Sequence, residues 1–341
     1  CRKKRWDNGT LLHNHYKWST HNLKTIFTAD IGGTNSRFAA FRLDGNQHLT
    51  HAASKWLQTG QARSFSGLLE TLSNSDFPVS MAEAQIAVIA VAGPIEDQRF
   101  SRPPNIAWDI DVSNAREDFG ISDCRLVNDF VAQAFACRSP VMASACQVVP
   151  GRIDAAAPLA VIGAGTGLGQ AALVPSAYGG YTAVPSEGGH KSFPFESASE
   201  IEYMNFLLQE TGEPYVRAET VVSGKGLSLV HRFLTGERLA PAKVAAAVTD
   251  KSETLKWMAR FYGRVSRNTA LQFLAFGGIY IAGGVAAKLP TLVTHREFER
   301  SFRHTATMTH VLEKIPVFLN TNEESGLWGA ALLGAQLLQS S

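Results

Sequence analysis

The chain has 341 residues, which is enough for about two domains. Apolar residues make up 45% of it and charged residues 18%, a balance typical of a globular protein with a large buried core. No run of about 18 apolar residues occurs, so the sequence predicts no membrane span. The net charge is +2, but residues 1–24 carry +5 and the rest about −3, so the body of the chain is not expected to bind nucleic acid.

Residues 1–24 differ from the rest of the chain in composition. They hold six basic residues and one acidic residue, and they contain no apolar segment of the kind that a secretory signal needs. We interpret them as a flexible polar extension. The cysteines at positions 1, 124, 137 and 146 form no CxxC pair or other zinc-like spacing, so we expect buried, reduced thiols. Reduced thiols are consistent with a cytoplasmic protein.

The first half of the body alternates strand-like and helix-like segments, as expected for an α/β protein. Three strand-like runs follow one another with short connections, which predicts an antiparallel meander. "AQIAVIAVAGPI" is a continuous apolar run that ends in Gly93 and Pro94, as in a central strand buried on both faces. The expected elements are strands at 24–31, 36–43, 49–56, 84–95 and 124–130, and helices at 64–75 and 131–138.

A second unit of the same kind begins near residue 140. "APLAVIGAGTGLGQAALV" has the pattern strand, glycine loop, strand, and the later "GGIYIAGGV" is a strand followed by a glycine turn. Ser197 and Glu200 have the spacing of a capping box at the start of a helix. The expected elements are strands on both sides of 163–169, a strand within 277–285, a strand at 315–320, and helices at 197–210, 251–276 and 325–339.

The glycine loops point to phosphate binding, because without a Cβ the backbone N–H groups can approach phosphate oxygens. A Walker loop, GxxxxGK[ST], is absent. A GxGxxA match at Gly167, Gly169 and Ala172 lacks the crossover helix that a dinucleotide site needs. The remaining scheme is a β-hairpin whose tip binds phosphate. It occurs twice, at 30–35 and 163–169, which indicates a weak internal duplication.

"DIGGTNSR" fits such a hairpin tip. Asp30 ends a strand and would face magnesium, while Gly32 and Gly33 permit the reversal. Thr34 and Asn35 offer hydroxyl and amide donors. The alternative is a plain hairpin turn with glycines at positive φ. The second such loop and the later "AGGV" favour the phosphate-binding interpretation.

Polar residues at other segment ends are candidates for catalysis. Asp129, in "LVNDF", follows a strand and is either a catalytic carboxylate or the N-cap of the next helix. "SEGGHKSF" holds Glu187 and His190, and "AETVVSG" holds Glu219. A Glu–His pair also suits a metal site, but zinc would lack enough partners nearby.

Six segments, "DIGGTN", "NDF", "GAGTGLG", "PSEGGH", "SGKGL" and "IAGGV", occur in this order. Over residues 24–340 the chain resembles the bacterial-type glucokinases of the sugar kinase–Hsp70–actin superfamily. The resemblance implies an α/β, two-lobed, ribonuclease H-like actin/hexokinase fold with mixed sheets and an interlobe cleft. We expect a small α/β domain of residues 25–139 plus 322–341, and a large α+β domain of residues 140–321.

The resemblance also implies ATP-dependent phosphorylation of D-glucose at its 6-hydroxyl, with Asp129 as general base. A carboxylate of ordinary pKa, about 4, is a weak base for an alcohol, so it would act late and largely by orienting the hydroxyl. Asp30 would bind Mg²⁺ through water. A cytoplasmic homodimer is expected, with no nucleic-acid or membrane partner. The implied sugar ligands are Asn105, Asn128, Asp129, Glu187, His190 and Glu219, and the implied ATP ligands are Asp30, Gly32, Gly33, Thr34, Asn35, Gly165, Thr166, Gly167, Gly283 and Gly284.

Three positions depart from the family pattern or stay ambiguous. Pro104 stands where threonine is usual, and Lys225, where proline is common, would reach a phosphate or face solvent. Trp108 fits a place near the sugar and a place in the core equally well. Alternative functions are a kinase for another hexose and a non-catalytic, sugar-responsive regulator of the same fold. A regulator would need an N-terminal helix-turn-helix domain of about 60 residues, and residues 1–24 are too short for one.

Overall fold

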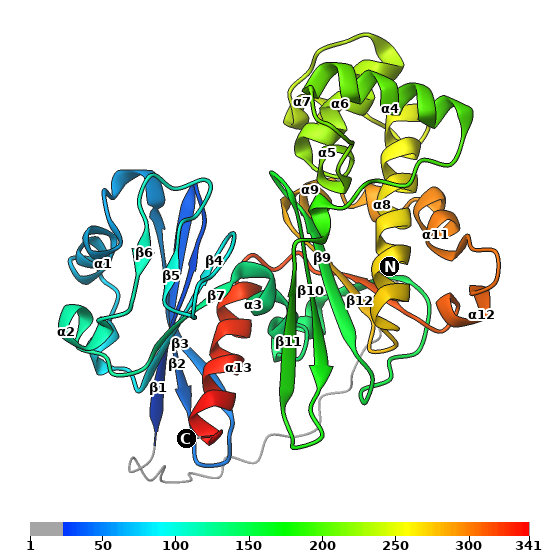
Figure 1. Ribbon diagram of the computed structural model, residues 1–341. Coiled ribbons are helices and arrows are strands. Elements are labelled where there is room, and N and C mark those ends of the chain that lie inside the picture. The colour runs from blue at the N-terminus through cyan, green and yellow to red at the C-terminus, as the bar shows by residue number, and fades with distance from the viewer. Residues whose placement is uncertain (1–22, 341) are drawn as a thin grey trace, which may run out of the picture.

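The computed structural model describes residues 23–340. Residues 1–22 and 341 lie outside the described residues, and with them nearly all of the predicted extension and Cys1. The described residues form two large β-sheets, with helices between them and on their outer faces, and a short two-stranded sheet of β5 (Phe100–Ser101) and β6 (Ile110–Asp111) (Figure 1). Within residues 23–340, no helix is both long and apolar enough to cross a membrane.

The first sheet contains five strands, in the order β3 (Leu49–Gln58), β2 (Asn35–Leu43), β1 (Lys24–Ile31), β4 (Ile86–Val91) and β7 (Cys124–Asn128). β1, β2 and β3 form the predicted antiparallel meander, and β4 and β7 continue the sheet parallel to β1. Every residue of β4 is buried, which confirms the central strand that its apolar run predicts.

The second sheet contains six strands, in the order β11 (Tyr181–Ser186), β10 (Leu168–Pro175), β9 (Leu159–Ala164), β12 (Ile279–Ala282), β13 (Val317–Leu319) and β8 (Cys146–Val149). Its first five strands repeat the order and the directions of the first sheet. β8 is an added edge strand, antiparallel to β13. The predicted internal duplication is therefore confirmed at the level of topology.

Helices cover both faces of the first sheet because successive strand side chains point to opposite faces. Phe27 and Phe38 pack against α1 (Phe65–Ser73) on the outer face. On the inner face, alternate strand residues pack against α13 (Ser325–Ser340) and α3 (Asp129–Ala136). These two helices also contact the second sheet, so they lie between the sheets (Figure 1).

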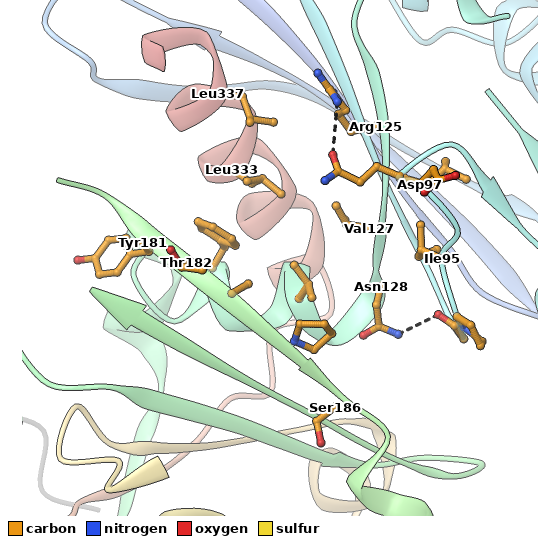
Figure 2. A pocket seen from close by; sticks show the side chains of 18 of the residues that line it. Ile95, Asp97, Arg125, Val127, Asn128, Tyr181, Thr182, Ser186, Leu333 and Leu337 are labelled. Atoms are coloured by element: carbon orange, nitrogen blue, oxygen red, sulfur yellow. Dashed lines mark hydrogen bonds between the residues drawn. The ribbon is translucent and has the colours of Figure 1, made fainter. Parts of the chain in front are cut away.

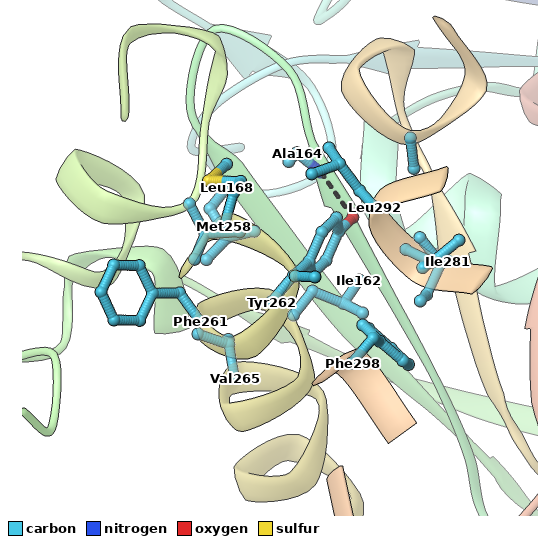
Figure 3. Close-up of a cluster of buried hydrophobic side chains, with 14 of the residues drawn as sticks. Ile162, Ala164, Leu168, Met258, Phe261, Tyr262, Val265, Ile281, Leu292 and Phe298 are labelled. Carbon is cyan, nitrogen blue, oxygen red and sulfur yellow. Dashed lines mark hydrogen bonds between the residues drawn. The ribbon is translucent and has the colours of Figure 1, made fainter. Parts of the chain in front are cut away.

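The outer face of the second sheet packs against the longest helix, α8 (Glu253–Phe273). Ile162 of β9 and Ile281 of β12 face Met258 and Tyr262 of this helix (Figure 3). α11 (Arg296–Arg303) covers α8 from outside. This side of the molecule carries a larger core than the first sheet does, which suits the larger predicted domain.

We propose the domain boundaries that the sequence predicts, because the first sheet and α13 fall in residues 25–139 plus 322–341, and the second sheet falls in 140–321. Most of the remaining short elements have no clear sequence signal. They are β5 (Phe100–Ser101), β6 (Ile110–Asp111), α2 (Ala115–Phe119), α5 (Ala218–Val221), α6 (Gly224–Thr235), α7 (Pro241–Ala247), α9 (Gly284–Lys288), α10 (Thr291–Thr294) and α12 (Thr309–Leu312), with 3₁₀ turns at Thr59–Gln61, Met81–Glu83, Pro140–Ser144 and Gly188–His190.

The predicted helix at 197–210 is α4 (Ala198–Thr211), but only half of its capping box forms. The Ser197 hydroxyl accepts from the Glu200 N–H over 3.3 Å, as predicted. The Glu200 carboxylate instead accepts from the Glu196 N–H and binds the buried Arg264. The Glu200 carboxylate therefore binds the neighbouring Glu196 N–H and a distant arginine in place of the Ser197 N–H that a capping box would use.

One further prediction needs correction. Cys124 and Cys137 are buried, but Cys146 is partly exposed, because it lies on the edge strand β8. The third glycine turn follows a strand, β12, as predicted. Gly283 has a φ of +85° and leads directly into α9, so this turn joins a strand to a helix.

Candidate active site

A cleft of about 580 Å³ lies between the two sheets. It opens at the carboxyl ends of β1, β4, β7, β9 and β12, which is where α/β folds commonly place their ligand sites. Gly32, Thr34, Asn35 and Gly284 belong to the bordering turns but do not line it. The predicted residues that line it are Asp30, Gly33, Asn105, Asn128, Asp129, Gly165, Thr166, Gly167, Glu187, His190, Glu219 and Gly283.

The first hairpin tip, residues 32–35, joins β1 to β2 as the sequence predicts. The Thr59 hydroxyl donates to the Gly32 carbonyl over 2.6 Å and braces the turn. Gly32 and Gly33 do not have positive φ, so the alternative of a plain positive-φ turn is wrong. A Cβ on Gly33 would lie 2.8 Å from Cβ of Asn105. Glycine is needed here because the Asn105 loop approaches the backbone so closely.

The second hairpin tip, residues 165–167, joins β9 to β10, again as predicted. Just before it, the Ala164 N–H donates to the buried Tyr262 hydroxyl over 3.1 Å (Figure 3). A Cβ on Gly167 would lie 2.7 Å from Oε2 of Glu219. The bare backbone therefore lets a carboxylate of α5 come directly against this tip.

Phe130 follows Asp129 in the chain and packs against the second hairpin. Its ring lies over Gly163 and Gly169, which are paired across β9 and β10. A Cβ on Gly169 would lie 1.9 Å from the Phe130 ring, and a Cβ on Gly163 would lie 2.8 Å from it. Both glycines are thus required for packing, which the motif alone did not reveal.

Asp129 is the first residue of α3 and lines the cleft. The N-cap is Asn128, whose side-chain oxygen accepts from the Phe130 N–H over 2.9 Å, so the N-cap alternative for Asp129 is wrong. Burial, followed by the nearby charge of Asp30, raises the pKa of Asp129 to about 7. The ordinary pKa assumed from sequence is therefore corrected upwards.

Asp30 is the second-to-last residue of β1 and lines the same cleft. Arg37, opposite it on β2, reaches its carboxylate over 3.4 Å. Burial raises the pKa of Asp30, and the Arg37 charge only partly offsets this. Asp30 and Asp129 thus place two carboxyl groups at the cleft beside one guanidinium, and burial disfavours the charged form of both.

A bound cation would favour the charged form of these carboxyls, so the pair fits a divalent cation with oxygen ligands. Among residues 23–340, no group of three or more His, Cys, Asp or Glu side chains is arranged to hold a metal ion. A magnesium ion at Asp30 would therefore take its other ligands from water and phosphate, as Mg²⁺ commonly does.

Glu187, His190 and Glu219 meet on the second-sheet side of the cleft. Nε2 of His190 lies 3.9 Å from Oε2 of Glu187 and 3.9 Å from Oε1 of Glu219. Arg217 lies beside them, bound to Glu219 and to Glu213, with Nη1 3.2 Å from Nδ1 of His190. Sequence reasoning missed Arg217, since no motif or spacing marks it.

The structure also shows where Trp108, Lys225 and Gly283 lie. Trp108 donates from Nε1 to the Ala62 carbonyl over 3.1 Å and, partly buried, packs against the core of the first sheet; it does not line the cleft. Lys225 is exposed on α6 and does not line the cleft. A Cβ on Gly283 would lie 2.7 Å from the Ala164 carbonyl oxygen, so this glycine is needed for packing as well as for its positive φ.

A larger cavity of about 710 Å³ adjoins the cleft (Figure 2). Leu333 and Leu337 of α13 line it, facing Tyr181 of β11. It shares Asn128 with the cleft, where the Asn128 amide donates to the Gly93 carbonyl over 3.1 Å. It contains neither hairpin tip nor Asp129, so its size does not make it the candidate active site.

The duplication defines the class of protein. Two sheets of one topology present equivalent hairpin tips to a shared cleft, which is the architecture of the two-lobed sugar kinases.

The family-level comparison agrees. The family model described as Glucokinase matches residues 27–337. The glucokinase of Chromobacterium violaceum is 34% identical over 328 residues, which cover 89% of this chain and 87% of the relative. That of Saccharophagus degradans is 32% identical over 322 residues, covering 89% and 96%. The chain therefore belongs to the glucokinase family, as the sequence motifs indicate.

Solved structures confirm the two-lobed fold. A glucokinase from an Antarctic psychrotroph has a TM-score of 0.77 and 27% identity, covering 93% of this chain and 99% of its own. The glucokinase of Balamuthia mandrillaris in complex with glucose has a TM-score of 0.73, covering 94% and 95%. At 21% identity, the second likeness concerns the fold alone.

Proposed function

We propose that the protein transfers the γ-phosphoryl group of ATP to the 6-hydroxyl of D-glucose, giving glucose 6-phosphate and ADP. Membership of the glucokinase family supports the reaction class. The observation that carries the proposal is the place of Asp129. Its carboxylate, with a pKa raised to about 7, lines a cleft that both hairpin tips border.

Asp129 acts as the general base in this proposal. The proton of the 6-hydroxyl passes to its carboxylate as the new oxygen–phosphorus bond forms and the bond to ADP breaks. A base with a pKa near 7 is both ionised enough and strong enough to act at neutral pH. The hydrogen bond from the Phe130 N–H, 3.0 Å from Oδ1 of Asp129, helps to orient the carboxylate.

The two hairpin tips hold the phosphates in this proposal. The Gly32 and Gly165 N–H groups close the turns by donating to the Asn35 and Gly167 carbonyls over 3.1 Å and 2.9 Å, so the phosphates would bind the other backbone N–H groups of the tips. Thr34, Asn35 and Thr166 add side-chain donors. The turn at Gly283 and Gly284 would lie against the adenosine. Bound Mg²⁺, held by Asp30 through water, would supply charge neutralisation for the transferring phosphoryl group.

The sugar-side residues provide the specificity. Asn105, Asn128, Glu187, His190 and Glu219 offer fixed donors and acceptors around one small volume. A site whose polar groups each bind one hydroxyl rejects an isomer steeply, since a mismatch leaves a polar group unpaired. We therefore expect a narrow hexose range.

The decisive test is Asp129→Ala. We expect kcat for glucose to fall by at least about 10³-fold, while glucose affinity stays within about tenfold, because base and alignment are lost but most sugar contacts remain. The matched control is Asp123→Ala, which removes a carboxylate that pairs with Arg125 outside the cleft. Near-normal turnover of Asp129→Ala in an assay of ADP release would contradict the proposal.

A sugar panel separates the alternatives. If fructose, mannose or an N-acetylated hexose were turned over faster than glucose, that sugar would be the substrate. Sugar binding with no ADP release would indicate the regulator alternative. The homodimer stays a prediction, which light scattering on the purified chain would test.

A further inference from the structure

Arg217 connects the polar groups on the sugar side of the cleft. Nε and Nη2 donate to the two carboxylate oxygens of Glu213 over 3.3 Å and 2.6 Å. Nη1 donates to Glu219 and lies 3.2 Å from Nδ1 of His190. Hydrogen bonding to Arg217 holds the pKa of Glu213 below its usual range, so this pair is charged on both sides.

The contact with His190 fixes which ring nitrogen carries the proton. A guanidinium has only donors, so Nδ1 of His190 must accept. A nitrogen that accepts carries no hydrogen, and the ring is therefore neutral with its proton on Nε2. A doubly protonated ring could not make this contact at all.

The remaining donor, Nε2–H, points to the carboxylate side of the site. The oxygens of Glu187 and Glu219 lie 3.9 Å away, which is too far for a hydrogen bond. Within residues 23–340, no hydrogen bond joins this nitrogen to another protein atom. One donor on the cleft wall is thus kept for a ligand.

We propose that Arg217 is a positioning residue for the sugar site. By donating to Nδ1 it keeps His190 neutral and makes Nε2–H a single, oriented donor to a sugar hydroxyl. It also occupies Oε1 of Glu219 and leaves Oε2 beside Gly167, so the second acceptor is oriented too. This inference rests on the proposed function of the cleft.

The test compares Arg217→Met with Arg232→Met. Arg232 is the matched control, because it pairs with Glu210 and stacks near Phe206 in the same domain without lining the cleft. We expect Arg217→Met to raise the KM for glucose about tenfold or more and to change kcat less than about threefold, since a sugar contact acts on binding. Arg232→Met should change neither by more than about twofold.

A double-mutant cycle with His190→Gln tests whether Arg217 acts through His190. Glutamine keeps a donor near the place of Nε2 but does not need an orienting partner at Nδ1. In that background Arg217→Met should cost less than about threefold in KM. An equal loss in both backgrounds would overturn the inference, because Arg217 would then act independently of the histidine.

Nitrogen-15 NMR of the unliganded protein gives a readout that a purely structural role would not change. The wild type should show His190, assigned by its loss in His190→Gln, as the neutral Nε2–H tautomer, and Arg217→Met should lose that pattern. A different tautomer in the wild type would overturn the inference even if the enzyme is active. If the wild type does not phosphorylate glucose, the proposed function fails, while the tautomer result still stands on its own.

Discussion

The two hairpin tips occupy equivalent places in their sheets, yet they are built from different residues. One pair before the end of each hairpin, Asp30 lies opposite Arg37 in the first, and Gly163 lies opposite Gly169 in the second. The first pair brings charge to the cleft. The second pair offers a flat, bare surface on which the ring of Phe130 rests.

This difference shows how a duplicated unit can divide its tasks. The first hairpin supplies the carboxylate that suits a cation, and its Gly33 makes room for the Asn105 loop. The second hairpin supplies no charged side chain at that pair, but it positions the helix that carries Asp129. Topology was kept, while the chemistry of the equivalent positions diverged.

Among changes to the two hairpins, removing the charge of Asp30 should have the largest effect. We expect Asp30→Asn to lower kcat by about 10²- to 10³-fold, because the group that suits Mg²⁺ is lost. Unfolding by urea should show no loss of stability at pH 8, since burial already disfavours the charged form. Asp76→Asn, a surface carboxylate paired with Lys55, is the control. If kcat of Asp30→Asn stayed within about tenfold of wild type, Asp30 would not be a ligand of the cation.

Filling the bare pair of the second hairpin should come next. The new Cβ of Gly169→Ala would lie 1.9 Å from the Phe130 ring, so the ring and the adjacent Asp129 must shift. We expect a 10- to 100-fold loss of kcat and a loss of about 1–3 kcal/mol in the free energy of unfolding. Gly60→Ala, where a Cβ meets open space, is the control. If Gly169→Ala and Gly60→Ala had the same kcat, the contact between Phe130 and Gly169 would not position Asp129.

The raised pKa of Asp129 predicts two pH effects. Because the base must be ionised, kcat/KM should fall about tenfold per pH unit below about pH 7. In the unfolded chain the carboxyl ionises near pH 4, so between pH 4 and 7 the wild type loses folding stability as pH rises. Asp129→Asn should therefore be more stable than the wild type at pH 8, with a free energy of unfolding in urea higher by on the order of 1–2 kcal/mol. The difference should vanish near pH 4.

The whole shift in the pKa of Asp129 would correspond to a larger difference in the free energy of unfolding. We expect a smaller one because the carboxylate borders a cleft that admits water. A flat activity profile from pH 5 to 8, or a variant less stable than the wild type at pH 8, would show that the pKa is not raised.

The smallest effect should come from the hydroxyl that anchors the second tip. Tyr262→Phe leaves the Ala164 N–H without its buried acceptor, and we expect a loss of about 1 kcal/mol with kcat changed less than about threefold. Tyr178→Phe, at a fully exposed tyrosine, should change nothing measurable. If the two variants were equally stable, this hydrogen bond would contribute nothing to the hairpin.

Much of the fold and the main residues of the candidate site could be predicted from the sequence, because their signals are local. Strand, glycine and strand within about ten residues leave little choice but a hairpin. Asp30 lies near the end of one strand and Asp129 directly follows another, and the carboxyl ends of parallel strands meet at one edge.

The missed features all depend on distant partners. Gly169 is explained by the ring of Phe130, and Arg217 by a histidine 27 residues earlier. The raised pKa of Asp129 needs the burial and the charge of Asp30, which no spacing shows. Glu200 has a local partner in the sequence, but Arg264 of α8 competes for its carboxylate.

The last helix, α13, covers the inner face of the sheet that begins the chain. During synthesis the five strands of this sheet emerge early, but much of one face remains exposed apolar surface until α13 has been made. The segment 24–128 must therefore wait for the segment 325–340 before its core is complete, against the usual order in which domains mature one after another. A chain truncated before residue 325 would leave this apolar surface open to non-native association.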